Sequence, residues 1–321
     1  MLVEFGDMRA GLTRQNLHGI WAAVHTPFHD DGRIDFDTLC ENIRRLHSAG
    51  VHGIYTTDSD GEFYAIELEE FRALADVVAA ECLRLRFPSM MGVTWVNTQG
   101  IVQRLKIAAE RGIMGAHVGF PFFMPLNDPS REQFWRDVSA AVPDTFGLIH
   151  YNTPRQQHVL GAGDYGHLER TFPKVIGSKY PQNAVDTFMD VTAHAPALSF
   201  FAGETVLAPL FQLGARGCNS WMIGYNPKFM LDWWDDLINS RWDDANAKNR
   251  RLVAFAQMLS GTMSETGNFH GIITKAVAAA SPFLLHHNRY SRAPYMPVSE
   301  KAFETFRRRA DVEFPDLAYH S

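Results

Sequence analysis

Short apolar runs alternate with longer amphipathic segments through the first three quarters of the chain. Each run is bounded by glycine, proline, threonine or serine, which is typical of a short buried strand. The alternation of such strands with helix-length segments indicates parallel pairing through right-handed crossovers. Eight strands are predicted, at residues 19–25, 51–57, 89–94, 115–119, 146–151, 175–180, 198–202 and 217–222.

The intervening segments have apolar residues at helical spacing. The first runs from Phe36 to Leu46, with Asp35 as its expected N-cap and Gly50 just past its end. No specific helix is predicted between Lys179 and the strand at 198, but the pattern as a whole fits eight βα units. Eight units favour a closed (β/α)8 barrel, the TIM barrel, over an open sheet. The other helices of the barrel are expected near 67–78, 98–111, 133–141, 165–171, 205–213 and 228–238.

The pattern changes after residue 240, where helical periodicity continues without strands. Three helices are expected there, at 241–261, 270–280 and 299–310. We therefore predict two domains. Residues 17–240 would form the α/β barrel, and residues 241–321 a C-terminal three-helix domain.

Composition narrows the class of protein. Of 321 residues, 46% are hydrophobic and 21% charged, as in an ordinary globular protein with a sizeable core. The net charge of −6 and the lack of a basic cluster beyond Arg307–Arg309 argue against a nucleic-acid partner. No apolar stretch is long enough to span a bilayer and the N-terminus has no signal pattern, so we expect a cytoplasmic protein with no membrane partner.

Motifs for cofactors are also missing. The three cysteines have no paired spacing, so neither a disulfide framework nor a zinc site is indicated. No glycine-rich nucleotide motif opens a helix. We expect no cofactor and no metal. The histidines His52, His117 and His150 fall inside predicted strands, where we interpret them as core residues.

Candidate chemistry lies at the carboxyl ends of the strands, where TIM barrels carry their active sites. Lys179 and Tyr151 end two successive strands. Burial should lower the pKa of Lys179 and give a nucleophilic amine, and Tyr151 could relay protons beside it. The alternatives are a surface lysine and a tyrosine that merely caps a strand. The other strand ends carry Thr26, Asp58–Glu62, Pro121–Phe123, Gly203–Glu204 and Asn219.

These residues, in this order, resemble the superfamily of dihydrodipicolinate synthase and N-acetylneuraminate lyase, the class I Schiff-base aldolases. The resemblance covers nearly the whole chain. The matching segments are Thr26–Phe28, Asp31–Asp35, Asp60–Glu62 with Leu68–Glu70, Pro121–Phe123, Tyr151–Pro154, Gly177–Lys179, Thr274–Ala276 and Arg292–Pro294.

The resemblance implies a barrel with three C-terminal helices, assembled as a tetramer or at least a dimer. It also implies that Lys179 forms an imine with a 2-oxo acid, commonly pyruvate, with Tyr151 and Ser59 in the proton relay. Residues around the substrate are then expected to be Asp60, Gly61, Glu62, Thr26, Phe123, Gly203 and Asn219.

Departures from the family pattern argue against dihydrodipicolinate synthesis itself. Asp60 replaces a threonine that holds the pyruvate carboxylate, and an ionised aspartate there would repel that group by about 4 kcal/mol at an effective dielectric constant near 20. Phe123 replaces a tyrosine lent across the dimer interface. Gln156 replaces an arginine, although Arg155 is adjacent.

The sequence therefore predicts a Schiff-base lyase, namely an aldolase, dehydratase or hydratase-aldolase that acts on a 2-oxo acid or related carbonyl compound. One alternative is a dehydratase or deaminase of a sugar acid or a hydroxyproline-derived ring. Another is a barrel that has lost catalysis and only binds. The retained Lys179 and Tyr151 argue against that last alternative.

Overall fold

Eight parallel strands close into a barrel in the computed structural model, which describes residues 11–181, 184–263, 270–285 and 288–319. Each strand pairs with its neighbours in chain order, and β1 pairs with β8 to close the ring through Trp21 opposite Asn219. The prediction of a (β/α)8 barrel is confirmed. The strands are β1 (Gly19–Ala23), β2 (Gly53–Thr56), β3 (Ser89–Gly92), β4 (Gly115–Val118), β5 (Gly147–Tyr151), β6 (Val175–Lys179), β7 (Ser199–Ala202) and β8 (Gly217–Ser220).

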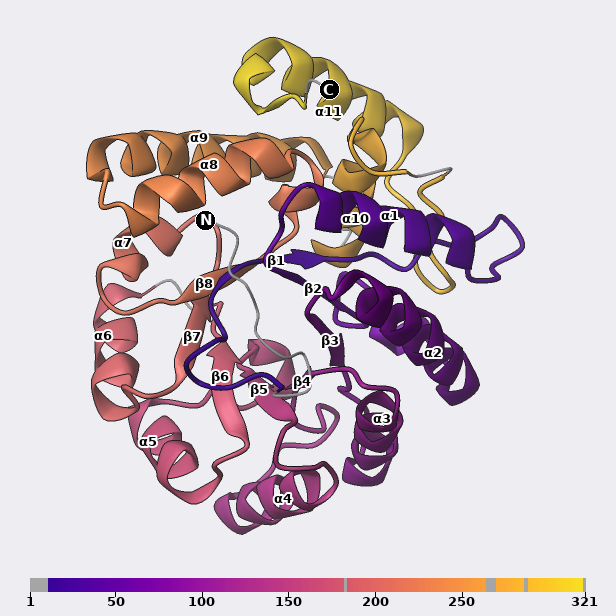
Figure 1. Cartoon of the computed structure of the whole chain (residues 1–321). Coiled ribbons are helices and arrows are strands. Elements are labelled where there is room, and N and C mark those ends of the chain that lie inside the picture. The colour runs from indigo at the N-terminus through magenta and orange to yellow at the C-terminus, as the bar shows by residue number, and fades with distance from the viewer. Residues whose placement is uncertain (1–10, 182–183, 264–269, 286–287, 320–321) are drawn as a thin grey trace.

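Helices form the outer ring around these strands (Figure 1). Asp35 caps the first helix as expected, because its side chain accepts a hydrogen bond from the backbone N–H of Thr38. The crossover between β6 and β7, where the sequence predicts no helix, contains α6. The N-cap of α6, Ala184, offers no side-chain acceptor that would mark the start of the helix. The ring consists of α1 (Phe36–Ser48), α2 (Leu68–Leu85), α3 (Thr98–Glu110), α4 (Asp128–Ala140), α5 (Ala162–Thr171), α6 (Val185–His194), α7 (Leu207–Phe211) and α8 (Pro227–Ile238).

Three further helices follow the barrel: α9 (Trp242–Met263), α10 (His270–Ala280) and α11 (Glu300–Glu313). In Figure 1, α9 lies along α8, α11 is outermost, and α10 lies beside α1. Most of α10 is buried, including Thr274 and Lys275. The C-terminal helices are confirmed, whereas the domain boundary at 240 stays a prediction. Within the described residues, no helix is both long and apolar enough to span a membrane.

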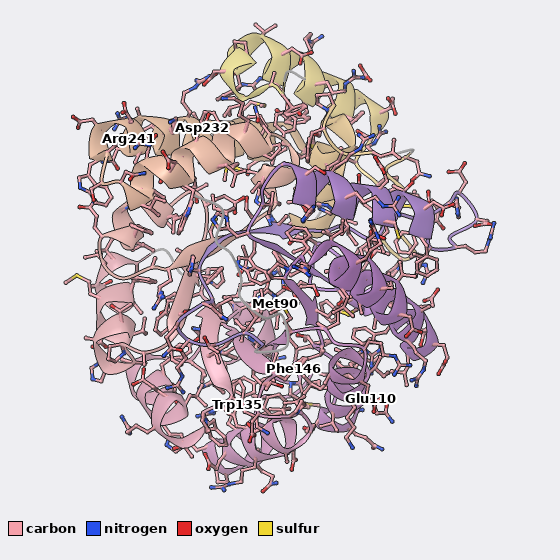
Figure 2. All side chains as sticks on the ribbon, in the orientation of Figure 1. Met90, Glu110, Trp135, Phe146, Asp232 and Arg241 are labelled. Carbon is pink, nitrogen blue, oxygen red and sulfur yellow. The ribbon has the colours of Figure 1, made fainter. Side chains whose placement is uncertain are left out.

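The core has two layers. One fills the inside of the barrel and includes Trp21, Tyr55 and Met90, and the larger one lies between strands and helices. Figure 2 shows Met90 within the ring of strands and Trp135 between the strands and the outer ring. Buried side chains therefore lie on both faces of the strands, and they position the strand ends at the barrel mouth.

Candidate active site

The loop after β2 is turned sharply into the barrel mouth. Thr57 has a left-handed backbone, with φ of 58°, which is uncommon for a β-branched residue. Its hydroxyl donates to the carbonyl oxygen of Gly92, 2.9 Å away. Thr26, in the loop after β1, donates its hydroxyl to the carbonyl oxygen of Gly61 at 2.8 Å. Thr26 and Gly61, both expected to surround the substrate, therefore fix the shape of this loop.

Lys179 ends β6 inside the barrel mouth and is paired with Asp58. Its Nζ lies 2.9 Å from Asp58 Oδ2, and the two side chains are 11% and 1% exposed. The same oxygen lies 2.7 Å from His117 Nδ1, on β4. An ionised carboxylate only accepts hydrogen bonds, so Nδ1 of His117 carries the hydrogen. The histidine interpreted as a core residue thus belongs to the site.

The protonation of this pair differs from the sequence-based expectation. Burial favours the neutral amine of Lys179, but Asp58 and the neighbouring tyrosines outweigh it and hold the lysine pKa well above its ordinary value. Burial alone would raise the pKa of Asp58, yet Lys179 and His117 lower it to about 2. The expectation of a lowered lysine pKa was wrong, because it ignored this carboxylate. Lys179 is an ammonium ion in the resting protein.

Two tyrosine rings contact the Lys179 ammonium group. Its Nζ lies 4.3 Å from the ring centroid of Tyr151 and 4.6 Å from that of Tyr55. These are cation–π distances. The hydroxyl of Tyr151 is 3.3 Å from Ser59 Oγ. The structure thus brings together Lys179, Tyr151 and Ser59, the three residues that the sequence proposed as catalytic.

Asp60 points to α10 rather than to Lys179. Its Oδ1 accepts a hydrogen bond from Thr274 Oγ1 at 2.7 Å and lies 3.7 Å from His270 Nε2. Burial alone would raise the pKa of Asp60, but His270, Lys179 and nearby groups lower it overall. Asp60 is therefore ionised at neutral pH, as the repulsion argument requires.

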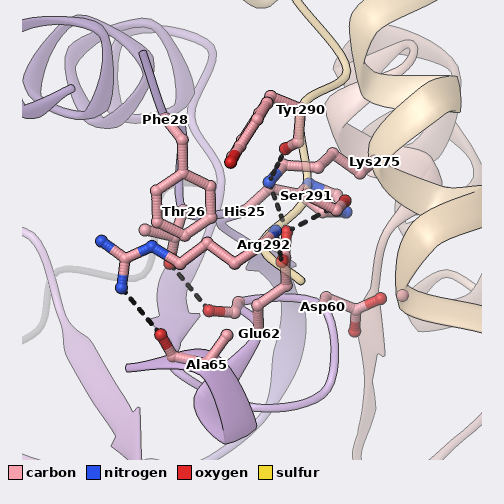
Figure 3. Close-up of polar contacts among 12 residues, drawn as sticks. His25, Thr26, Phe28, Asp60, Glu62, Ala65, Lys275, Tyr290, Ser291 and Arg292 are labelled. Carbon is pink, nitrogen blue, oxygen red and sulfur yellow. Dashed lines mark hydrogen bonds and ion pairs between the residues drawn. The ribbon is translucent and has the colours of Figure 1, made fainter. Parts of the chain in front are cut away.

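Glu62 is bound by the C-terminal part of the chain. It forms a buried ion pair with Lys275, and Ser291 and the backbone N–H of Arg292 also contact it. Figure 3 shows this arrangement, with Lys275 and Arg292 on either side of the Phe28 ring. The expectation that Glu62 binds substrate is not supported, since its carboxylate is engaged by these partners.

Glu204 and Asn219 lie at the ends of β7 and β8. Burial raises the pKa of Glu204 to about 7, and its Oε1 accepts hydrogen bonds from Ser220 Oγ and the backbone N–H groups of Trp221 and Met222. Asn219 is 8% exposed, and among the described residues neither of its amide atoms has a hydrogen-bond partner. Both amide atoms are buried, so a substrate could contact them only if the surrounding side chains moved.

Two further expected positions, Gly203 and Phe123, and the replaced arginine position, Gln156, complete the comparison with the sequence. Gly203 has open space above it, since an added Cβ would meet only Val206 at 4.0 Å. Phe123 is 72% exposed in the single chain, so the chain alone does not bring it to Lys179. Gln156 bonds the backbone of Phe120 and Tyr151, which leaves its amide engaged.

Sequence reasoning missed Asp58, His117, Glu204 and Thr274 as members of the site. Asp58 and Glu204 stood at strand ends beside residues that were chosen, so their position was a usable signal. His117 lies within a strand, and its direction into the mouth follows from alternation along β4. Thr274 lies in a segment that resembles the family, Thr274–Ala276, but nothing in the sequence indicated its contact with Asp60, because the two positions are far apart in the chain.

Comparisons with known proteins identify the family of the chain. The family model described as the dihydrodipicolinate synthetase family matches residues 16–312. The 4-hydroxy-tetrahydrodipicolinate synthase of Thermus thermophilus is 28% identical over 63% of this chain and 68% of its own length. The trans-O-hydroxybenzylidenepyruvate hydratase-aldolase of Pseudomonas putida is 27% identical, but the match spans only 53% of each chain.

Solved structures share the fold. YagE, a prophage protein of the dihydrodipicolinic acid synthase family from E. coli K12 in complex with pyruvate, has a TM-score of 0.84 at 20% identity, over 92% of this chain and 98% of its own. PhdJ bound to a substrate intermediate has a TM-score of 0.78 at 24% identity, over 94% and 96%. With the family model matched over nearly its whole length, the chain belongs to the dihydrodipicolinate synthetase family, whose members include lyases.

Proposed function

We propose that the protein is a Schiff-base lyase that acts on a small carbonyl compound, a 2-oxo acid or a relative of one, through an imine on Lys179. The observation that carries this proposal is the position of Lys179. It is a buried lysine at the end of β6, with Tyr151 beside it and the Tyr151 hydroxyl 3.3 Å from Ser59. Family membership and the similarity to a hydratase-aldolase support a reaction that makes or breaks a C–C bond.

The residues have distinct parts in this chemistry. The amine of Lys179 attacks the carbonyl carbon, so a C–N bond forms while the carbonyl oxygen takes a proton through Tyr151 and Ser59. Loss of that oxygen as water leaves a protonated imine. The imine withdraws electrons from the neighbouring carbon, which permits C–C bond cleavage, C–C bond formation or loss of a hydroxyl group.

The substrate differs from that of a dihydrodipicolinate synthase. Ionised Asp60 stands where the family pattern places the threonine that holds a carboxylate. The amide of Gln156, in place of an arginine, is engaged by backbone. The neutral hydroxyl groups of Ser59 and Tyr151 lie beside Lys179 instead. We propose a substrate whose carbonyl neighbourhood is bound mainly by neutral hydrogen-bonding groups.

A binding barrel without catalysis is the second candidate. It is favoured by the ion pair with Asp58, which holds Lys179 as an unreactive ammonium ion at rest.

We also propose assembly with further copies of the chain, since Phe123 and Met124 expose 72% and 67% of their surface on the loop after β4.

Borohydride trapping tests the enzyme proposal. The protein is mixed with a panel of 2-oxo acids, aldehydes and hydroxyketones, reduced with borohydride, and examined by mass spectrometry of its peptides. At least one carbonyl compound should leave an irreversible adduct on Lys179, and Lys179→Arg should abolish it.

Lys174→Arg is the matched control, because Lys174 precedes the same strand and bonds backbone oxygens of Ser139 and Val142 away from Tyr151. This variant should trap as well as wild type. An adduct on another lysine would refute the assignment of Lys179. No adduct across the panel would favour the binding barrel.

A further inference from the structure

Asp58 occupies a position that is built for its carboxylate. The left-handed Thr57 turns it inward, and an added Cβ at Gly92 would lie 2.1 Å from Asp58 Oδ1. His117 holds the other oxygen at 2.7 Å. Residues from β3, β4 and β6 therefore shape the space around one aspartate that is 2% exposed.

Asp58 and His117 each have one polar atom without a hydrogen-bond partner among the described residues. Oδ2 of Asp58 accepts hydrogen bonds from both Lys179 and His117, whereas Oδ1 has no hydrogen-bond partner among the described residues. Nε2 of His117 has none either. When the carbonyl carbon of a substrate is bonded to Nζ of Lys179, the substrate oxygen is two bonds away from Nζ. Nζ itself lies 2.9 Å from Asp58 Oδ2. Asp58 is thus within reach of the group that leaves as water.

We propose that Asp58 is a catalytic residue, acting as counter-ion of the protonated imine and as donor of the proton that leaves with water, and that His117 positions it. This inference rests on the proposed function, since it presupposes an imine on Lys179.

The proton balance is closed. Asp58 first takes one proton from the Lys179 ammonium ion, which gives a neutral amine and a neutral acid. The amine adds to the carbonyl carbon, and a second nitrogen proton passes to the oxygen through Tyr151 and Ser59, giving the neutral carbinolamine. Asp58 then returns its proton to the hydroxyl group, the C–O bond breaks, and water leaves. The products are a protonated imine and the original carboxylate.

Electrostatics explains why a buried carboxylate would assist. The site holds one cation and the Asp58 anion before the reaction, and the same two charges afterwards. The protein therefore need not reorganise its dipoles when the bond forms. The other groups facing this pair are the rings of Tyr55 and Tyr151 and the more distant carboxylate of Asp60. Without Asp58, a buried iminium ion would lack its nearest counter-charge.

Asp58→Asn tests the inference with two readouts of opposite sign. Each protein is equilibrated with pyruvate or with hydroxyacetone, which lacks the carboxylate, and quenched with borohydride. The adduct on Lys179 should need at least tenfold more carbonyl compound in the variant. Trace labelling with acetic anhydride at pH 7, which modifies neutral amines, should rise at least tenfold at Lys179 relative to Lys174, because the ammonium loses its partner.

His117 variants provide the second arm, in case Asp58→Asn fails to fold by circular dichroism. His117→Asn keeps a donor near Nδ1 and should trap within about threefold of wild type, whereas His117→Leu should behave like Asp58→Asn. If wild type traps, and Asp58→Asn and His117→Leu trap as well as wild type does, this inference is wrong while the proposed function stands. If wild type traps nothing, both fail.

Discussion

Three carboxylates at alternate positions of one loop meet three different partners. Asp58 pairs with a lysine of β6, Asp60 accepts from a threonine of α10, and Glu62 pairs with a lysine of α10. The same functional group, a carboxylate, therefore serves three purposes within five positions. Only the first lies against the proposed nucleophile. Charge at this loop cannot be interpreted as one acidic patch.

Asp60→Thr should tighten the binding of pyruvate by at least tenfold. The substitution removes an anion from the place where the family pattern holds a carboxylate, and relief of only about 1.4 kcal/mol gives that factor. Because the pKa of Asp60 is lowered, the residue stays ionised from pH 5.5 to 8.5. The gain should therefore be similar at both ends of that range, as measured by borohydride-trapped adduct against pyruvate concentration.

Asp31→Asn is the control, since Asp31 is a surface residue whose side chain is 53% exposed and pairs with Arg33. It should bind pyruvate as wild type does. Weaker binding in Asp60→Thr would mean that Asp60 does not oppose the carboxylate.

Glu204→Gln should stabilise the protein at high pH. The pKa of Glu204 is raised to about 7, so between about pH 4.5 and 7 the unfolded chain ionises this group while the folded protein does not. Wild type loses stability through that window and keeps the deficit, about 3 kcal/mol, above it. Gln retains an acceptor oxygen for Ser220 and the two amides.

Urea unfolding at pH 5 and pH 8 measures the effect. The variant should gain less than about 1 kcal/mol at pH 5 and about 3 kcal/mol at pH 8. Glu304→Gln, at a side chain that is 58% exposed, should show no such difference between the two pH values. An equal gain at both pH values would contradict a titrating Glu204.

At the scale of elements, the ends of neighbouring strands shape one another. Gly92 ends β3, and its missing side chain leaves room for the Asp58 carboxylate and the Thr57 carbonyl of the loop after β2. A glycine here is required by close approach rather than by backbone angles. The geometry around Lys179 is therefore set partly by a residue that does not contact it.

Gly92→Ala should reduce trapping at Lys179 by tenfold or more. The added methyl group would overlap Asp58 Oδ1 at 2.1 Å and the Thr57 oxygen at 2.4 Å, so the carboxylate must move. Gly163→Ala is the control, because nothing lies within 4 Å of its added Cβ on α5. The control should trap normally. Trapping by Gly92→Ala at the wild-type level, with folding intact, would show that the loop adapts.

At the scale of the molecule, the helices after residue 240 are joined to the barrel mouth through buried charge. Lys275 and Glu62 are 2% and 0% exposed at their side chains, and Lys275 also donates to the carbonyl oxygen of Tyr290 at 2.8 Å. Burial lowers the pKa of Lys275 in spite of Glu62. A contact of this kind fixes α10 against the loop that carries Asp60.

Lys275→Met should destabilise the protein by about 3–5 kcal/mol, because it leaves the Glu62 carboxylate buried without its cation. The double variant with Glu62→Gln should recover part of this loss. Lys228→Met removes the exposed partner of Asp232 and should leave the urea midpoint unchanged. If the single and double variants are equally destabilised, Lys275 matters through packing and not through charge.

The fold could be predicted because it depends on local periodicity. Apolar runs and caps such as Asp35 mark elements within a few residues of themselves. Among the α-helices of the barrel, α6 was not predicted, and its N-cap Ala184 has no capping side chain. Within the site, strand ends identified Lys179 and Tyr151. The protonation of Lys179 could not be predicted, since its partner Asp58 is 121 positions away and that pairing follows from the closed barrel.

The two contacts between this loop and α10 also constrain how the protein could be redesigned. A relative's loop sequence grafted onto residues 58–62 would replace Asp60. Thr274 and Lys275, which contact Asp60 and Glu62, would stay unchanged. If Glu62 were exchanged as well, an ammonium group would remain sealed without a counter-charge. A redesign of the substrate preference should therefore replace residues 58–62 and α10 together.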